Sequence, residues 1–427
     1  LVIMTDQQSA HMMSCAGNGY FQTPAMDNIA ASGVRFQRAY CTDPVCVPSR
    51  FSLLTGRMPS EIALRSNDSS HLDGVPAHIR EQGLGRLLRS AGYEVAYGGK
   101  EHLPKMRVAD LGFEYICNDQ RDELATTCAD FVGRRRDKPF FLFASFINPH
   151  DICYMAIRDW AVGEKHERLL ARGTTELATL DEALQIPEGV TREEFFERLC
   201  PPLPPNLEPP EDEPEAIRRM CAASPFRGRA REGYTDEQWR MHRWAYARLT
   251  ERVDRQIGQV LDALRGGPNA HDTLVIFTSD HGDMDSAHRL EHKGVHYEEA
   301  CRIPLLVADP SVSCAGDDNA HLVSNGLDLL PTLCDYAGIA PPADLQGLSL
   351  RPLIEGRPPG TWRNHVPVEF GAGRALVADR FKYALYDEGA NRELLLDRVE
   401  DPGEMQNRID DPACAEILAQ LRAQLWS

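Results

Sequence analysis

The stretch "TLVIFTSDHGDM", residues 273–284, joins a strand-length apolar run to two residues capable of chemistry, Asp280 and His281. Three other apolar runs end in the same way: "LVIMT" before Asp6 and Gln7, "YEVAYGG" before Lys100 and His102, and "PFFLFASFI" before His150. Near-continuous apolar strands separated by helices indicate an α/β fold, with a mostly parallel central sheet sandwiched by helices. Because ligands bind at the carboxyl ends of such strands, we expect the four polar ends to converge on one crevice.

The clearest predicted helix supports this fold class. The segment "DEQWRMHRWAYARLTERVDRQIGQVLDALRGG", residues 236–267, keeps apolar residues at helical spacing. It follows Thr235, a candidate N-cap, and it closes on two glycines. It leads directly into the strand that delivers Asp280, as expected for a helix that covers one face of the sheet.

Two regions depart from the strand and helix alternation. Residues 186–230 are rich in proline and acidic residues, which predicts an ordered excursion over the surface; it forms either part of a substrate rim or a plain connector. Beyond about residue 345 the chain changes to shorter alternating segments and a last helix. We therefore predict a main α/β domain over residues 1–345 and a smaller C-terminal α+β subdomain over residues 346–427.

Composition excludes several classes of protein. The chain has 427 residues and a formal net charge of -18, which argues against nucleic-acid binding because phosphate affinity needs a surplus of Lys and Arg. No apolar run approaches the roughly 20 residues of a membrane span, so we predict none. Twelve cysteines are spread along the chain without a CxxC pair, which is typical of buried small apolar residues. The chain opens directly on a strand, and we expect any export signal to have been removed before it.

Four residues at two of the polar strand ends suggest a metal site. Asp6, Gln7, Asp280 and His281 together offer two carboxylates, an amide oxygen and an imidazole. Oxygen ligands suit Ca²⁺ or Mg²⁺, and the histidine also admits Mn²⁺ or Zn²⁺. A single aspartate after a strand is usually a turn or capping residue, so the prediction depends on the four residues acting together.

Cys46 stands in "CVPSRFSLLTGR", residues 46–57. Pro48 suits the first turn of a helix, which predicts that the cysteine lies just before a helix N-terminus. That end favours an anionic nucleophile or transition state, and Arg50, one turn along, could reach the same space. From composition alone, a plain buried cysteine remains the alternative.

These residues carry a family resemblance. The segment at 46–57 resembles the C-x-P-S-R-x-x-L-L-T-G signature of type I sulfatases in the alkaline-phosphatase superfamily. Six further segments resemble the family in order along the chain: "IMTDQQ", "GGKEH", "NPHD", "TSDHGDM", "HKGVHYEEACRIPL" and "DRVEDPGEMQN". The resemblance implies the family's α/β fold and a sulfuric ester hydrolase. Its substrates would be sulfate monoesters, on a carbohydrate or another sulfated small molecule.

The resemblance also implies a mechanism. In sulfatases the signature cysteine is oxidised by a maturation enzyme to formylglycine, whose hydrate attacks sulfur with help from a divalent metal ion. Cys46 would be that precursor. Arg50 would hold the formylglycine, and His102 would lie beside the hydroxyl of that residue. Lys100 and Lys293 would contact sulfate oxygens. The leaving oxygen would be protonated by His150 or, as second choice, by Lys293. The metal ligands would be Asp6, Gln7, Cys46, Asp280 and His281.

Two positions depart from the common family pattern. Many sulfatases have an aspartate where Gln7 stands and an asparagine where His281 stands, and the forms seen here resemble a bacterial branch with choline-sulfatase-like and phosphonate-monoesterase-like enzymes. Ca²⁺ is the first choice of metal, followed by Mn²⁺ or Mg²⁺. The rival functions are a phosphonate or phosphate ester hydrolase and a catalytically silent binder of sulfated glycans. The family resemblance favours a periplasmic or secreted location.

Overall fold

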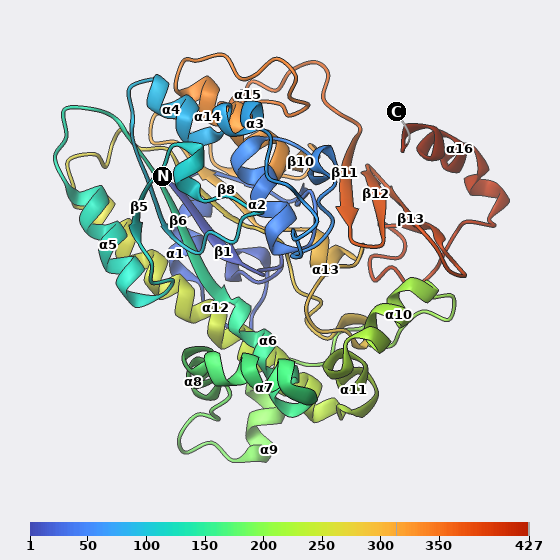
Figure 1. The fold of residues 1–427 in the computed structure, drawn as a ribbon. Helices are drawn as coiled ribbons and strands as arrows, with labels where there is room; N and C mark the ends of the chain where they lie inside the picture. The colour runs from blue at the N-terminus through green and yellow to red at the C-terminus, as the bar shows by residue number, and fades with distance from the viewer. Residues whose placement is uncertain (313, 426–427) are drawn as a thin grey trace.

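The computed structural model describes residues 1–312 and 314–425. A mostly parallel sheet of eight strands lies at its centre, in the order β5-β4-β6-β1-β7-β8-β2-β9 (Figure 1). The strands are β1 (Val2–Asp6), β2 (Val34–Phe36), β4 (Glu94–Gly99), β5 (Glu114–Cys117), β6 (Phe140–Pro149), β7 (Val275–Ser279), β8 (Leu305–Ala308) and β9 (Gly316–Asp318). Only β8 runs antiparallel to its neighbours. A short parallel pair, β3 (Ala39–Tyr40) and β10 (Val323–Ser324), lies apart from this sheet.

Alternate residues of the central strands fill two separate cores, one on each face of the sheet. In β1, Val2 and Met4 join a core with helices α2, α4 and α14, whereas Ile3 joins a core with α1, α5 and α12. These helices are α1 (Pro24–Ala31), α2 (Cys46–Thr55), α4 (Leu84–Ser90), α5 (Asp122–Gly133), α12 (Asp236–Arg265) and α14 (Asn325–Tyr336). Burial on both faces explains why the strands are apolar throughout, and the predicted fold class is confirmed.

Helix boundaries agree with the sequence pattern at α12 and differ slightly at α2. Thr235 caps α12, and its hydroxyl accepts a hydrogen bond from the backbone N–H of Gln238, which confirms the predicted N-cap. Helix α2 begins at Cys46 itself, so the prediction that Cys46 lies just before the helix is wrong by one residue. The extended backbone of Val45 makes that residue the N-cap. Pro48 is tolerated because the first N–H groups of a helix have no partner within it.

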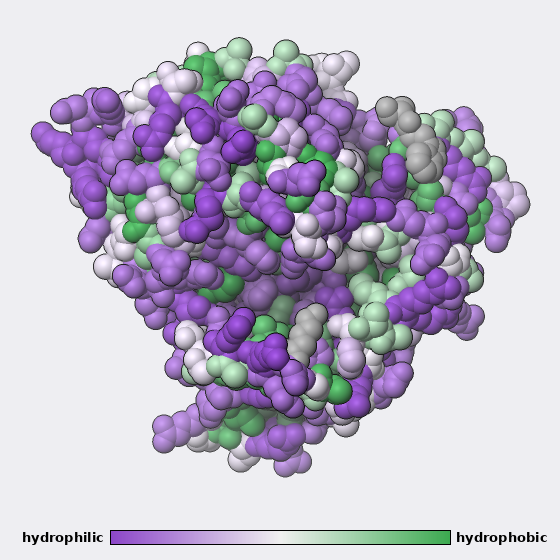
Figure 2. Space-filling model, viewed as in Figure 1, coloured by the Kyte–Doolittle hydropathy of each residue, from purple (hydrophilic) through white to green (hydrophobic). Residues whose placement is uncertain are grey.

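A lobe of short helices lies below the sheet in Figure 1 and packs against the first half of α12. It contains α6 (Cys153–Asp159), α7 (Gly163–Arg172), α8 (Thr174–Ala183), α9 (Arg192–Glu194), η5 (Phe195–Leu199), α10 (Glu215–Ala223) and α11 (Pro225–Gly233). Residues 200–214 of the proline-rich excursion form turns and loops. Figure 2 shows that this face of the molecule is largely hydrophilic and is hollowed near its centre, between the lobe and the body that holds the sheet.

The C-terminal part forms a second sheet. Its four antiparallel strands follow chain order, β11 (His365–Phe370), β12 (Gly373–Ala378), β13 (Phe381–Tyr386) and β14 (Glu393–Asp397). One face packs against α16 (Ala415–Gln424), and the other packs against α10 and the segment around Tyr297. An α+β subdomain is therefore confirmed, while its boundary at residue 345 stays a prediction. Among the described helices, none is both long and apolar enough to cross a membrane.

The remaining helices are short and connect these elements. They are η1 (Ser14–Ala16), η2 (Pro59–Ile62), α3 (Ala77–Glu81), η3 (Val108–Leu111), η4 (His150–Ile152), η6 (Ala287–Arg289), α13 (Glu298–Cys301), α15 (Arg351–Ile354) and η7 (Pro412–Cys414).

Candidate active site

Four neighbouring parallel strands, β4, β6, β1 and β7, end at the same edge of the central sheet. Each is followed by, or ends in, a side chain selected from the sequence: Lys100, His150, Asp6 and Asp280. Helix α2 adds Cys46 and Arg50 from the facing side. The predicted convergence of the polar strand ends is confirmed, because the contacts below join residues that lie up to 286 positions apart in the chain.

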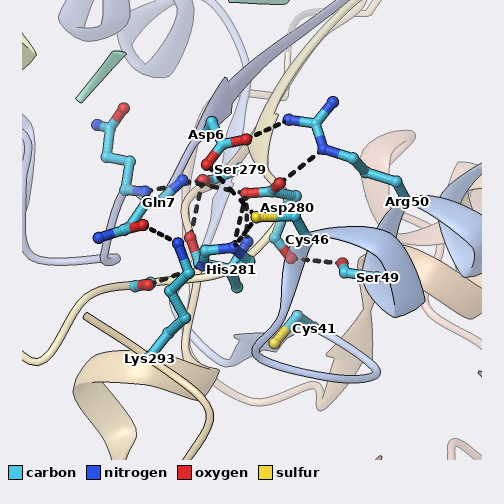
Figure 3. A network of polar contacts seen from close by, with 12 residues as sticks. Asp6, Gln7, Cys41, Cys46, Ser49, Arg50, Ser279, Asp280, His281 and Lys293 are labelled. Carbon is cyan, nitrogen blue, oxygen red and sulfur yellow. Dashed lines mark hydrogen bonds and ion pairs between the residues drawn. The ribbon is translucent and has the colours of Figure 1, made fainter. Parts of the chain in front are cut away.

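Arg50 lies at the centre of the cluster and ties two strand ends together (Figure 3). Its Nη2 atom lies 2.7 Å from Oδ2 of Asp6, and its Nε atom lies 2.8 Å from Oδ2 of Asp280. Its Nη1 group donates a hydrogen bond of 2.8 Å to the hydroxyl oxygen of Ser145. All of these groups are buried, so the geometry of the guanidinium fixes the positions of both carboxylates.

The sulfur of Cys46 faces these charged groups. It lies 3.2 Å from Nε2 of His281, 3.9 Å from Oδ1 of Asp6 and 3.9 Å from Nζ of Lys100. Burial raises the pKa of the thiol, but the charges of Lys100, Lys293 and His281 outweigh burial and hold that pKa well below its ordinary value. This position therefore stabilises a negatively charged atom.

Four side chains converge as potential metal donors. The donor atoms of Asp6, Cys46, Asp280 and His281 all lie within 4.8 Å of one another. Burial and the neighbouring carboxylate of Asp6 raise the pKa of Asp280, and a divalent cation would relieve that repulsion. Nδ1 of His281 lies 2.9 Å from the carbonyl oxygen of Gly282, which leaves Nε2 directed toward the cluster. The residues present therefore fit a divalent metal ion.

Two lysines approach the cluster through different partners. The Nζ atom of Lys100 lies 2.6 Å from Oδ2 of Asp6. The strand before it ends at Gly99, where a side chain would collide with the carbonyl oxygen of Ser145 at 2.0 Å, so only glycine permits this path. Lys293 donates a hydrogen bond to Oε1 of Gln7.

Gln7 is oriented by a residue beyond the cluster. Its Nε2 group donates a hydrogen bond of 2.5 Å to Oδ2 of Asp283, which leaves Oε1 toward Lys293 and 3.1 Å from the sulfur of Cys153. The oxygen of Gln7 thus faces the same space as the two lysines. Its assignment as a metal ligand stays a prediction.

Two histidines complete the surroundings of Cys46. His102 and His150 are each close enough to Cys46 for a side-chain hydrogen bond that affects ionisation. Burial, followed by the positive charges of Lys100 and Lys293, lowers the pKa of His150 to about 4. The Nδ1 atom of His150 is buried and has no hydrogen-bond partner in the described part of the chain. His102 is the more exposed of the two.

Sequence reasoning missed three residues of this site. Ser145 is a polar residue inside the apolar run "PFFLFASFI", and that irregularity was a usable signal. Asp283 stands in the quoted stretch at 273–284, but its role depends on a contact with Gln7 across 276 positions. Cys153 is one of twelve cysteines and carries no signal of its own.

Three histidines near the site in sequence were assigned no role, and they pack among buried groups. His288 stacks on Tyr297 at 3.8 Å between ring centroids. Nδ1 of His296 lies 2.7 Å from the hydroxyl oxygen of Tyr386. His292 packs against Phe226.

Comparison with known proteins places these features in a family. A sulfatase family model matches residues 1–339, and a model described as the C-terminal part of N-sulphoglucosamine sulphohydrolase matches residues 286–427. A Delta 4,5-hexuronate-2-O-sulfatase of Bacteroides thetaiotaomicron is 30% identical, and the match covers 100% of this chain and 87% of that protein. An N-acetylglucosamine-6-O-sulfatase of the same organism is 25% identical over 95% of this chain and 82% of that protein.

Solved structures agree with the sequence comparison. The structure of a 2-O GAG sulfatase superposes with a TM-score of 0.83 at 28% identity, covering 99% of this chain and 90% of that one. A phosphonate monoester hydrolase of Agrobacterium radiobacter superposes with a TM-score of 0.74 at 22% identity, covering 99% of this chain and 95% of that one, which shows a shared fold. The chain belongs to the sulfatase family of the alkaline-phosphatase superfamily.

Proposed function

We propose that this sulfatase hydrolyses sulfate monoesters on a carbohydrate, at the cluster around Cys46. One observation carries the proposal: the charges of Lys100, Lys293 and Arg50 all act on the buried sulfur of Cys46, which lies with two buried carboxylates and an imidazole. Cations are concentrated here although the whole chain is acidic, with a net charge of -18. Such a site attracts a small anion and stabilises the charge that develops on its oxygens.

The lysines would bind the sulfate group. The Nζ atoms of Lys100 and Lys293 approach the cluster through different partners, so each would donate hydrogen bonds to a different sulfate oxygen. Arg50 is held by Asp6 and Asp280, and it would keep the residue at position 46 in the line of attack. The positively charged surroundings that lower the pKa of the Cys46 thiol would equally stabilise an anionic transition state.

Two groups would complete the site. We propose that Cys46 is converted to formylglycine by a maturation enzyme, which supplies a hydrated aldehyde as nucleophile. Asp6, Asp280 and His281, with the oxygens of Gln7 and the converted residue 46, would hold a divalent metal ion that acts as a Lewis acid. Ca²⁺ is our first choice because the donor set is dominated by oxygen, and Mn²⁺ or Mg²⁺ are the alternatives.

His150 would donate the proton to the leaving alcohol. Its pKa is low in the unliganded protein because it is buried beside Lys100 and Lys293. A bound sulfate ester would neutralise those lysines and raise the pKa of His150 toward the range in which it acts as an acid near neutral pH.

The carbohydrate part of the proposal rests on relatives. The match to the hexuronate-2-O-sulfatase covers the whole of this chain, and a second relative is an N-acetylglucosamine-6-O-sulfatase. Segments 60–75 and 152–230, which the signature motifs do not include, would set the choice of sugar. A periplasmic or secreted location rests on the family resemblance alone.

Two measurements test the proposal on protein produced together with a formylglycine-generating enzyme. Mass spectrometry of the peptide with residue 46 should show conversion of the thiol to the aldehyde. The converted protein should then hydrolyse an aryl sulfate far faster than the matched aryl phosphonate. A preference of several orders of magnitude for the phosphonate would favour the rival esterase function, and binding of sulfated glycan without turnover would favour the silent binder.

A further inference from the structure

A cavity of about 200 Å³ is lined by Asp43, whose charge acts on Cys46 of the catalytic cluster. It opens between the chain around η2 and the turn that joins β11 to β12 in the C-terminal sheet. Its polar lining consists of Asp43, Ser60, Arg65, Glu369 and Arg374. The cavity is smaller than the roughly 300–1,000 Å³ of sites that enclose drug-sized ligands, so it suits a single small ring.

Asp43 forms the buried wall of this cavity and lies three residues before Cys46. Its side chain is fully buried, and among the residues that the structure describes neither carboxylate oxygen has a hydrogen-bond partner of ordinary geometry. The backbone N–H of Val45 is close enough to favour the charged form, but burial and the nearby Glu369 outweigh it and raise the pKa of Asp43 well above its ordinary value. Burial therefore disfavours the charged form of Asp43, and hydrogen-bond donors from a ligand would stabilise that form.

The other carboxylate that lines the cavity, Glu369, already accepts a hydrogen bond within the protein. Oε2 of Glu369 accepts a hydrogen bond of 2.9 Å from the backbone N–H of Ser60, and the N–H of Glu369 donates one of 2.7 Å to the carbonyl of Thr42. These two bonds hold the C-terminal sheet against the chain segment that carries Asp43 and Cys46. The free acceptors on Asp43 are therefore held at a fixed distance from the nucleophile.

We propose that this cavity is a sugar subsite, in which Asp43 accepts hydrogen bonds from ring hydroxyls of the sulfated carbohydrate. This inference rests on the proposed function and adds the residue that would recognise the sugar. Hydroxyl groups are donors that a carboxylate accepts in pairs, and a sugar offers them on adjacent carbons. A cation is a poorer occupant, because Arg65 already places positive charge beside Asp43.

Arg65 would contribute at the mouth of the cavity. It is half exposed and pairs with the exposed Asp387 at 2.8 Å. An exposed pair of this kind contributes little to stability, so the guanidinium is free to turn toward an anionic substituent of the glycan. The cavity thus combines acceptors for hydroxyls on its inner wall with a donor for a carboxylate or second sulfate at its edge.

The test compares sugar and non-sugar esters in three proteins: wild type, Asp43→Asn and Asp43→Ala. The probes are 2-O-sulfated methyl hexuronoside, 6-O-sulfated N-acetylglucosamine, 4-nitrophenyl sulfate, and deoxy analogues of the better sugar. We expect the ratio of kcat/KM for that sugar to kcat/KM for the aryl sulfate to fall at least tenfold in both variants. We also expect kcat/KM of the wild type for one deoxy analogue to be at least tenfold lower than for the parent sugar. The substitution Asp43→Asn should lower kcat/KM for that analogue by less than twofold further.

The outcomes separate this inference from the proposed function. A wild-type protein with confirmed formylglycine that hydrolyses no sulfate ester would refute the function itself. Turnover of sulfate esters with a sugar-to-aryl ratio unchanged within twofold in Asp43→Asn would refute only the subsite. Equal losses on both esters, together with a lower Tm, would mean a structural role and also overturn it. A wild type with a tenfold higher kcat/KM for the aryl sulfate than for both sugar sulfates would also refute the subsite.

Discussion

The protein contains two clusters of buried charge, and they differ in what their charges face. The catalytic cluster joins Asp6, Arg50 and Asp280 at the edge of the central sheet. The second, which we call the junction cluster, joins Glu298, Lys382, Arg398 and Glu404, where the C-terminal sheet meets the chain before β8. The Nζ atom of Lys382 lies 2.7 Å from Glu298 and 2.6 Å from Glu404, and it donates a third bond of 2.9 Å to the carbonyl of His296.

The two arrangements show that burial of charge does not by itself indicate function. In the junction cluster a cation stands between the carboxylates, and its ammonium group also donates a hydrogen bond to a backbone carbonyl. In the catalytic cluster Arg50 also pairs with both carboxylates, but donor atoms of Asp6, Asp280, His281 and Cys46 still converge within 4.8 Å of one another. Like charges that face a common point need a ligand, whereas alternating charges satisfy one another. We therefore expect substitutions in the first cluster to affect turnover and substitutions in the second to affect stability.

The largest expected effect follows from replacement of the nucleophile. Cys46→Ala should lower kcat for an aryl sulfate by a factor of roughly 10⁴ or more, because the covalent route is lost. The free energy of unfolding should change by about 1 kcal/mol or less, since only one buried sulfur atom is removed. The matched control is Cys41→Ala, which removes a buried thiol five residues earlier and should keep activity. Wild-type turnover by Cys46→Ala would refute the mechanism.

Removal of Lys382, the central cation of the junction cluster, should lower stability and leave turnover nearly unchanged. Lys382→Met leaves two buried carboxylates without their shared cation, which should lower the free energy of unfolding by about 3–5 kcal/mol at neutral pH. The activity of the protein that remains folded should stay within twofold of wild type. Urea unfolding followed by fluorescence measures the stability, and Lys138→Met, at an exposed lysine, serves as the control. A stability change below 1 kcal/mol would show that the pairs contribute little.

Removal of a cation from the catalytic cluster should again act on turnover. Lys100→Ala should lower kcat/KM for an aryl sulfate by about 10²-fold, because one donor to the developing charge is lost. The free energy of unfolding should change by about 1 kcal/mol, since Arg50 still pairs with Asp6 at 2.7 Å. Lys105→Ala, at an exposed lysine five residues further on, is the control. Equal effects of the two substitutions on kcat/KM would contradict the assignment.

The catalytic cluster was largely predictable because its residues follow a local rule. Four strands of the central sheet, β1, β4, β6 and β7, end where an apolar run meets polar side chains, and their parallel direction brings those ends to one edge. The pattern at 273–284 therefore located Asp280 and His281 without knowledge of their partners. The junction cluster follows no such rule: Lys382 stands inside the strand-like segment "FKYALY", and its partners lie in segments that the sequence does not connect to it.

Side-chain orientation and burial were not predictable. The amide of Gln7 is oriented by Asp283, and the geometry of that contact depends on how the loops after β1 and β7 fold together. Asp43 reads as a polar loop residue beside Pro44, yet it is fully buried because the C-terminal sheet covers it. Both features arise from contacts between distant segments, which hydrophobic periodicity does not describe.

The last effect we predict is a pH dependence of stability in the junction cluster. Burial, opposed by Lys382 but reinforced by Glu298, raises the pKa of Glu404 from 4.5 to about 7. The folded protein thus binds this proton more tightly than the unfolded chain does. The contribution of Glu404 to stability is complete below pH 4.5 and is lost as the pH rises to about 7, a change of about 3 kcal/mol at most.

The substitution Glu404→Gln should remove this slope, because the amide does not ionise. The measured quantity is the free energy of unfolding of wild type minus that of the variant, followed from pH 4.5 to 7.5; it should fall with rising pH. Glu298 does not interfere in this window: Arg398 and Lys382 hold its pKa below the ordinary value against the effect of burial, so its contribution changes only in more acidic solution. Glu400→Gln, at an exposed carboxylate on the neighbouring segment, should leave the slope unchanged. A flat difference for Glu404→Gln would mean that Lys382 compensates both carboxylates equally, and the junction cluster would then be fully charge-paired at neutral pH.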